Sequence, residues 1–364
     1  MSIIKKRFTF LVTTILLFSG MAVAQKPDLD MKIGQMILIG FPKPEVDPLT
    51  LAEIKAGKAG AIIYFEKNLP AQNTIEAVKK MNEMYQKAAK IPLLICIDQE
   101  GGKVNRMKTK YGFPKSVTAT YLGKTQSLDS VRYYAGTTAQ ALKNVGFNVN
   151  FAPCVDLAVN PENTVIVKVE RSFSKNADTV ALFATEVVKQ HRKQGVLTSL
   201  KHFPGHGSSL VDTHFGVADV TSTWSDKEIK PYKIMLANGN VDAVMTSHIV
   251  NRQLDPSGLP GTLSKRIIDS LLRKKIGFNG VVFSDDMQMK AIADNFTLEE
   301  TIKLAINAGV DIMCFSNNIP GSKERTVDRV HQIIKQMVES GEIKKERIDE
   351  SYNRIMALKK KLNR

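Results

Sequence analysis

The sequence contains eight short apolar runs, and segments with helical spacing separate them. The runs cover residues 34–41, 60–65, 92–98, 149–156, 196–203, 242–249, 280–286 and 311–317. Most of the runs are continuously apolar rather than alternating, as expected for parallel strands that are covered on both faces. The pattern therefore predicts a series of strand–helix units.

The segments between the runs have the spacing of amphipathic helices. Residues 297–309 and 324–341 are two examples, and Gly309 and Gly341 stand where helix C-caps belong. Eight such units in about 300 residues fit a (β/α)₈ TIM barrel, an α/β fold, with a doubly wound open sheet as the alternative. Polar residues follow almost every run, which favours the barrel because barrel enzymes place their chemistry at that end of the strands. We expect one catalytic domain over residues 25–364.

The two ends of the chain carry signals of their own. Three basic residues at 5–7 precede an apolar run that ends in an A-x-A site, the pattern of a secretory signal peptide over residues 1–24 with cleavage after Ala24. A membrane anchor is the alternative, although the run falls short of the ~20 residues that span a bilayer. We expect an exported protein, periplasmic or secreted, with no integral membrane association. Residues 342–364 predict an amphipathic helix packed on the barrel, with a solvated basic end.

The charge balance is basic, with 51 Lys and Arg against 36 Asp and Glu and a formal net charge of +15. This excess suggests an anionic partner, and nucleic acid is the first class to consider. The chain has one Trp, no zinc knuckle and no interleaving of basic and aromatic residues. We therefore expect no nucleic-acid partner.

Cysteine usage gives no metal signal. Cys96, Cys154 and Cys314 are widely separated, and each lies in an apolar run. Buried free thiols are the expected state, since no C-x-x-C spacing exists for a metal site or a disulfide framework. We expect neither a metal nor a cofactor.

The segment Lys201–Gly216, KHFPGHGSSLVDTHFG, holds three of the six His residues. His202 and His206 have a spacing that suits a metal on a helix, but Pro and Gly residues break that helix and no H-E-x-x-H pattern exists. A phosphate loop would need a G-x-x-x-x-G-K-[ST] motif, which is missing. The third possibility is a loop that delivers Asp212 and His214, where the carboxylate orients the imidazole and stabilises its protonated form. Plain loop-stabilising contacts are the alternative.

The third and seventh runs also end in charged residues. Asp285 and Asp286 end the seventh run, and because successive strand residues point to opposite sides we expect at most one carboxylate at the barrel mouth. It would act as a nucleophile or a metal ligand, although paired acids also cap helices. Asp98, with Arg106 downstream, suits bidentate hydrogen bonding to vicinal hydroxyls or a carboxylate, or else a salt-bridged loop.

Four motifs together resemble one family. They are KHFPGHG followed by D-T-H, IDQEGG, RSFS at 171–174, and FSDDMQM. The combination resembles bacterial N-acetyl-β-glucosaminidases (β-N-acetylhexosaminidases) of glycoside hydrolase family 3, single-domain enzymes that remove N-acetylglucosamine (GlcNAc) from peptidoglycan fragments. The resemblance runs from about Met31 to the C-terminus. It departs from the family pattern at Lys103, at Thr213, in the VIVKVE segment before Arg171, and in having a signal peptide.

The resemblance implies a role for each matched residue. Asp285 would be the nucleophile, and His214 would be the general acid/base with Asp212 as its partner. The substrate-binding residues would be Asp98, Arg106, Arg171, Lys201, His202 and His248.

The implied function is that of an exo-acting, retaining β-N-acetylglucosaminidase. It would hydrolyse terminal non-reducing GlcNAc from muropeptides or related β-GlcNAc glycosides through a covalent glycosyl-enzyme. We expect a monomer whose partner is a small carbohydrate or muropeptide, and the positive charge fits anionic cell-wall fragments or surface solvation. The alternatives are a non-catalytic peptidoglycan-binding barrel, a β-glycosidase or glycoside phosphorylase of the same family, and a substrate-assisted hexosaminidase, which usually needs an adjacent Asp-Glu pair.

Overall fold

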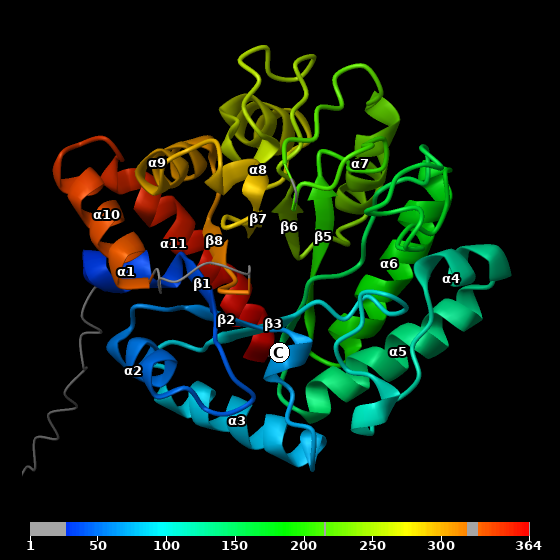
Figure 1. The fold of residues 1–364 in the computed structure, drawn as a ribbon, viewed down its shortest axis with the longest axis horizontal. Helices are drawn as coiled ribbons and strands as arrows, with labels where there is room; N and C mark the ends of the chain where they lie inside the picture. The colour runs from blue at the N-terminus through cyan, green and yellow to red at the C-terminus, as the bar shows by residue number, and fades with distance from the viewer. Residues whose placement is uncertain (1–26, 215, 319–326, 364) are drawn as a thin grey trace, which may run out of the picture.

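Eight parallel strands close into a barrel in the order β1 to β8, and helices pack around it (Figure 1). The structure is a computed structural model that describes residues 27–214, 216–318 and 327–363. Its strands are β1 Ile37–Gly40, β2 Ala61–Tyr64, β3 Leu94–Ile97, β4 Val149–Asn150, β5 Leu197–Phe203, β6 Ala243–Thr246, β7 Val281–Asp286 and β8 Ile312–Phe315. Each strand lies within one predicted run, and β1 pairs with both β2 and β8. The predicted (β/α)₈ barrel is confirmed.

Helices alternate with the strands as the spacing predicts. They are α1 Leu29–Gln35, α2 Pro48–Ala56, α3 Thr74–Ala88, α4 Ala119–Thr125, α5 Leu128–Asn144, α6 Ala177–Lys193, α7 Lys230–Ala237, the π-helix η5 Arg266–Lys275, α8 Lys290–Ala293, α9 Leu298–Ala308, α10 Val327–Glu339 and α11 Lys345–Lys359. Gly309 follows α9 with a φ of 119°, and Gly341 follows α10 with a φ of 81°. Both predicted C-caps therefore have the left-handed backbone that glycine adopts without steric cost. Residues 324–326 of the second predicted helix lie outside the described residues.

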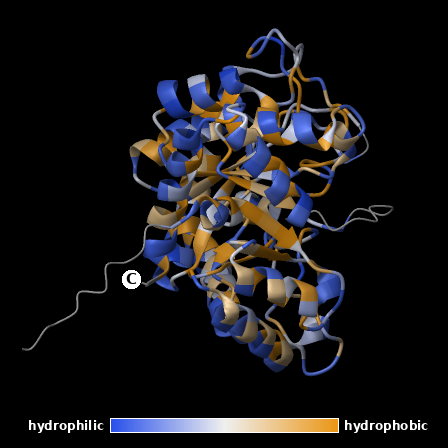
Figure 2. Ribbon diagram, turned by 90° about the vertical axis from the view of Figure 1, so that its left-hand side faces the viewer, coloured by the Kyte–Doolittle hydropathy of each residue, from blue (hydrophilic) through white to orange (hydrophobic). Residues whose placement is uncertain are grey.

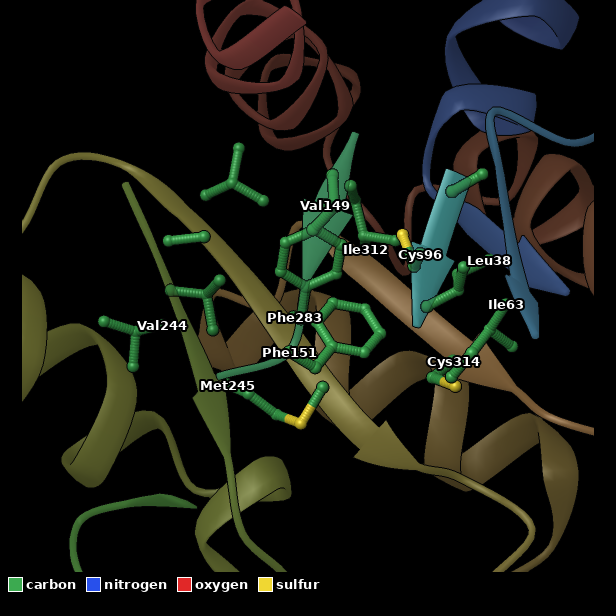
Figure 3. Close-up of a cluster of buried hydrophobic side chains, with 14 of the residues drawn as sticks. Leu38, Ile63, Cys96, Val149, Phe151, Val244, Met245, Phe283, Ile312 and Cys314 are labelled. Atoms are coloured by element: carbon green, nitrogen blue, oxygen red, sulfur yellow. The ribbon is translucent and has the colours of Figure 1, made fainter. Parts of the chain in front are cut away.

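Apolar side chains fill the interior of the barrel (Figure 3). The rings of Phe151 and Phe283 meet edge to face, with their centroids 5.1 Å apart. Figure 2 shows the hydrophobic strands at the centre and helices with hydrophilic outer faces around them. Because strands such as β1, β2 and β3 are buried on both faces, their sequences are continuously apolar. Cys96, Cys154 and Cys314 are free and buried, as predicted.

The C-terminal helix α11 packs on the barrel through buried residues that include Ile348 and Ile355, as predicted. The expectation of a solvated basic end is wrong for Lys359, which is buried. Its Nζ donates to Oε1 of Gln35 at 2.6 Å and to the carbonyl of Gly60 at 2.9 Å, next to the N-terminal ends of β1 and β2. The long apolar stem of lysine lets the helix end pack inside while the amine finds these acceptors.

The sequence predicts a signal peptide and no integral membrane association. The predicted signal peptide, residues 1–24, lies outside the described residues and stays a prediction. Within the described ranges, no helix combines the length and the apolar character that crossing a bilayer requires.

Candidate active site

A cavity of about 660 Å³ opens at the C-terminal ends of the strands. Eight of the nine residues that the sequence assigns to catalysis or binding line it. They are Asp98, Arg106, Arg171, Lys201, His202, Asp212, His214 and Asp285. These residues come from distant parts of the chain and meet here because parallel barrel strands end on one rim. The ninth residue, His248, does not belong to the lining.

Lys201, on β5, is the centre of an ion-pair network in the cavity wall. Its side chain is 2% exposed, and its Nζ lies 2.6 Å from Oδ1 of Asp98 and 2.6 Å from Oε1 of Glu100. Burial disfavours the charged amine, but the two carboxylates outweigh this effect and raise the pKa of Lys201. The ammonium therefore ties β5 to the loop that follows β3.

Both carboxylate oxygens of Glu100 contact cationic side chains closely, whereas one oxygen of Asp98 does not. Arg171 donates to Glu100 from Nε at 2.9 Å and from Nη2 at 2.8 Å. Burial would raise the pKa of Glu100, but Arg171 and Lys201 hold that pKa well below its usual range. Asp98 is 15% exposed, and its Oδ2 has only a loose contact, at 3.7 Å, with Nη2 of Arg106. Asp98 and Arg106 are thus placed to hydrogen bond with the hydroxyls of a ligand.

His202 is held in one tautomer by its neighbours. Its Nδ1 lies 2.6 Å from Oδ2 of the buried Asp156 and donates to it, while Nη2 of Arg171 donates to Nε2 at 3.1 Å. Cys154, Asp156 and His202 each bring one potential metal-ligating atom within 4.8 Å of the others. The Cys154 thiol also donates to Oδ2 of Asp156, at 3.2 Å. The three side chains therefore already satisfy one another's hydrogen-bonding groups.

Asp212 and His214 form the local hydrogen bond that their spacing predicts. Nδ1 of His214 lies 2.7 Å from Oδ1 of Asp212, which also accepts the His214 backbone N–H at 2.9 Å. This contact raises the pKa of His214 against the effect of burial. Burial would raise the pKa of Asp212, but the same contact lowers it. The His214 side chain is 59% exposed at the cavity, so the imidazole can exchange a proton with a bound ligand.

Asp285 and Asp286 both line the cavity, so the expectation that at most one would face the barrel mouth is wrong. The cause is a bulge in β7. Its pairing with β8 passes from Phe283 opposite Ile312 to Asp286 opposite Cys314, three residues against two. One extra residue on a strand interrupts the alternation of its side chains.

The two neighbouring carboxylates differ in their surroundings. Asp286 accepts hydrogen bonds from the hydroxyl and the N–H of Ser316 and from the N–H of Gln288, and burial raises its pKa to about 6. Burial would also raise the pKa of Asp285. Three imidazoles around Asp285 and the Asp286 N–H, which donates to its Oδ1 at 2.8 Å, instead lower this pKa to about 2. Of these two neighbours, Asp285 is thus the stronger acid, and its carboxylate is ionised at neutral pH, as a nucleophile must be.

His248 lies behind the cavity wall and is fully buried. Its Nε2 is 2.9 Å from the backbone carbonyl of Asp286, and its Nδ1 is 2.8 Å from Oγ1 of Thr262. Protein groups therefore occupy both ring nitrogens. This position does not fit the direct substrate contact that the resemblance implies for His248.

Two carboxylates of the network, Glu100 and Asp156, carry no role in the sequence-based assignment. Their only signal is a place at the C-terminal side of an apolar run, where Asp156 is the last residue of the run 149–156 and Glu100 comes after the run 92–98. Their partners Arg171 and His202 are 71 and 46 residues away along the chain, so the sequence gives no direct indication of these pairs.

Comparisons with known proteins agree with the fold. The profile of the family described as "Glycosyl hydrolase family 3 N terminal domain" matches residues 28–358. Beta-hexosaminidase A of Pseudoalteromonas piscicida is 32% identical, over 93% of this chain and 58% of its own length. A glycoside hydrolase family 3 beta-N-acetylglucosaminidase structure from Paenibacillus sp. str. FPU-7 has a TM-score of 0.85 at 34% identity, covering 93% of this chain and 63% of that one. The beta-N-acetylhexosaminidase structure from Beutenbergia cavernae has a TM-score of 0.82 at 27% identity, covering 92% of this chain and 99% of that one.

Proposed function

This chain belongs to glycosyl hydrolase family 3, and we propose that it is an exo-acting, retaining β-N-acetylglucosaminidase. Its substrates would be muropeptides or related glycosides that end in a non-reducing β-GlcNAc residue. The names of the relatives from Pseudoalteromonas and Paenibacillus support N-acetylhexosaminide chemistry. The observation that carries the proposal is that Asp285, the Asp212–His214 pair and the Lys201 network share one cavity.

In the first step, an oxygen of the Asp285 carboxylate attacks the anomeric carbon and forms an ester. The glycosidic bond breaks, its electron pair passes to the leaving oxygen, and His214 delivers the proton that this oxygen takes up. The hydrogen bond to Asp212 stabilises the protonated imidazole that this step needs. The low pKa of Asp285 keeps the nucleophile ionised at neutral pH.

In the second step, His214 takes a proton from water, and the resulting hydroxide attacks the anomeric carbon and releases Asp285. Two inversions at that carbon retain the β configuration. Most retaining glycosidases use a second carboxylate as the acid/base, about 5 Å from the nucleophile. A histidine in this role is not itself an anion and repels phosphate less than a carboxylate would, so phosphate could replace water as the acceptor and yield a glycosyl phosphate.

The network around Lys201 would hold the sugar ring. Asp98 and Arg106 offer an acceptor and a donor at the cavity edge, which suits adjacent hydroxyls. Glu100 holds Arg171, Asp156 holds His202, and the two side chains contact each other, so their positions do not depend on a ligand. Such preorganisation lowers the entropy cost of binding.

Turnover of an aryl N-acetyl-β-glucosaminide tests the proposal, together with analysis of the products from muropeptides and chitobiose. The first sugar product seen by proton NMR should be the β anomer, and no turnover of any β-GlcNAc substrate would support a non-catalytic barrel instead. Asp285→Asn should abolish turnover, whereas the matched control Asp286→Asn should retain most of it. Glycosyl phosphate among the products in phosphate buffer would identify a phosphorylase activity.

Export is a separate part of the proposal. The basic, apolar and A-x-A segments of residues 1–24 support cleavage after Ala24 and a periplasmic or secreted protein. N-terminal sequencing of the protein recovered from the producing cells should begin at Gln25. A protein that begins at Met1 and stays in the cytosol would refute this part alone.

A further inference from the structure

We propose that His248 is a positioning residue for the nucleophile, because its Nε2–H holds the backbone carbonyl of Asp286 and so fixes the strand end that carries Asp285. The proposal rests on the proposed function, since it takes the Asp285 carboxylate as the nucleophile. It gives His248 a structural contact with the reacting strand in place of a contact with the sugar.

The geometry of the imidazole fixes where its proton lies. A backbone carbonyl can only accept, so Nε2, at 2.9 Å from the oxygen of Asp286, must carry the hydrogen. Burial lowers the pKa of His248, and the neighbouring Asp285 carboxylate opposes this effect. The other ring nitrogen, Nδ1, lies 2.8 Å from Oγ1 of Thr262, and this hydroxyl also donates to the Ser247 carbonyl at 3.1 Å. Contacts at both ring nitrogens thus fix the orientation of the imidazole.

His248 continues the contact between β6 and β7 beyond the end of their ladder. The last paired residues are Met245 and Phe283. His248 is three residues after Met245, and Asp286 is three residues after Phe283. The imidazole therefore joins the segments that continue β6 and β7 in the same register. The side chain therefore makes a contact that backbone pairing no longer provides.

Asp285 needs this support because it lies in the bulge of β7. On one side of it, the Ser284 hydroxyl accepts the N–H of Cys314 at 2.9 Å. On the other side, Asp286 lies opposite Cys314 and is held by His248. The extra residue of a bulge lacks a regular ladder partner. These two anchors therefore hold the backbone on both sides of Asp285, whose Oδ1 accepts the Asp286 N–H.

Loss of the His248 contact should affect the chemical step and not the binding of sugar. A misplacement of about 1 Å in a reacting group can cost a factor of about 100 in rate. Asp98 and Lys201, which are proposed to hold the sugar, pair with each other, whereas the hydrogen-bonding contacts of His248 are Thr262 and the Asp286 carbonyl. The expected signature is thus a lower rate of bond formation at unchanged substrate affinity.

Two variants separate the hydrogen bond from the bulk of the ring. In His248→Gln the side-chain amide reaches about as far as Nε2 and can donate to Asp286, whereas in His248→Asn the amide ends near the position of Nδ1. The control is His331 on α10, whose Nε2 donates to the backbone carbonyl of Asp30 at 3.0 Å, far from the cavity. The variants His331→Gln and His331→Asn measure the general effect of losing such a contact.

The measurement is the rate of covalent trapping by a 5-fluoro-N-acetyl-β-glucosaminyl fluoride, with the melting temperature of each variant recorded. We expect H248N to be trapped about 100-fold more slowly than the wild type at an inhibitor affinity within about threefold, and H248Q within about tenfold of the wild-type rate. H331N and H331Q should be trapped at the wild-type rate even where their melting temperatures fall.

Trapping of H248N within about threefold of the wild type, or of H248Q as slowly as H248N, would overturn the positioning role. If H248N does not fold, H248Q decides alone. Near-wild-type trapping of folded H248Q supports the role, and loss of trapping overturns it. If the wild type itself is not trapped while substrate turns over, the nucleophile assignment fails instead, so the two failures are distinguishable.

Discussion

The hydroxyl of Ser284 accepts a hydrogen bond from the backbone N–H of Cys314 across 2.9 Å, at the point where β7 has one residue more than β8. Both residues are buried. Backbone carbonyls accept these bonds in a regular parallel ladder, so the side chain of Ser284 completes the ladder at the bulge that brings Asp285 to the cavity.

Replacing this hydroxyl should destabilise the fold and slow turnover together. Ser284→Ala leaves the buried N–H of Cys314 without its acceptor, which should lower the free energy of unfolding by about 1–3 kcal/mol. Ser199→Ala on β5 is the matched control, because its buried hydroxyl has no hydrogen-bond partner among the described residues. Denaturant unfolding and kcat measure both effects. Equal behaviour of the two variants would contradict the role of Ser284.

The pH profile of turnover should report the contact between Asp212 and His214. That contact raises the pKa of His214, so the imidazole keeps its proton to a higher pH than a free histidine. Asp212→Asn removes the charge, so the alkaline limb of kcat/KM should move to lower pH and kcat should fall. An unchanged alkaline limb would assign that limb to another group.

The acid role of His214 predicts a dependence on the leaving group. An activated aryl oxide needs little protonation as it leaves, whereas a sugar hydroxyl needs much. His214→Ala should therefore lose about 100-fold or more on chitobiose and far less on a dinitrophenyl N-acetyl-β-glucosaminide. Comparable losses on both substrates would remove His214 from the acid role.

Glu228 should make the folded protein less stable as pH rises. Its Oε2 accepts the N–H of Gly207 at 2.8 Å, and burial raises its pKa to about 7. Between about pH 4.3, where an unfolded glutamate titrates, and pH 7, the folded state binds the extra proton, so stability falls as pH rises through this window.

A variant without this titration isolates the effect. Glu228→Gln stays neutral, so its free energy of unfolding relative to the wild type should rise by about 3 kcal/mol between pH 4 and pH 8. Chemical denaturation at both pH values measures the difference. A difference that does not change with pH would show that Glu228 does not titrate in this window.

The sequence predicts the barrel well because its signal is spread along the whole chain. Every strand is buried on both faces, so each appears as an apolar run, and β5 matches its run almost residue for residue. β4 is the exception, since only Val149–Asn150 of the run 149–156 is a strand. The chain leaves the regular ladder after Asn150, and the buried residues that follow rejoin the sheet only through an isolated parallel bridge between Cys154 and Lys201 of β5.

The site is predictable where its contacts are local. Asp212 and His214 are two residues apart, so their hydrogen bond can be read from the spacing. The pair Glu100–Arg171 joins residues far apart in the chain and depends on the closed barrel. The prediction that only one of Asp285 and Asp286 faces the cavity assumed the strict alternation of a strand. It is wrong because β7 has a bulge, which no residue type in the sequence marks. The sequence did not indicate that Lys359 is buried, because a basic helix end is usually solvated.

Mass spectrometry of the protein after incubation with a 5-fluoro-N-acetyl-β-glucosaminyl fluoride is the most direct test of the covalent mechanism. We predict one sugar adduct per chain, on the Asp285 side chain, present in D286N and missing in D285N. An adduct on Asp286 or another residue would contradict the assignment of the nucleophile. Steady turnover of β-GlcNAc substrates with no adduct at all would contradict the double displacement and favour attack by the substrate's own N-acetyl group.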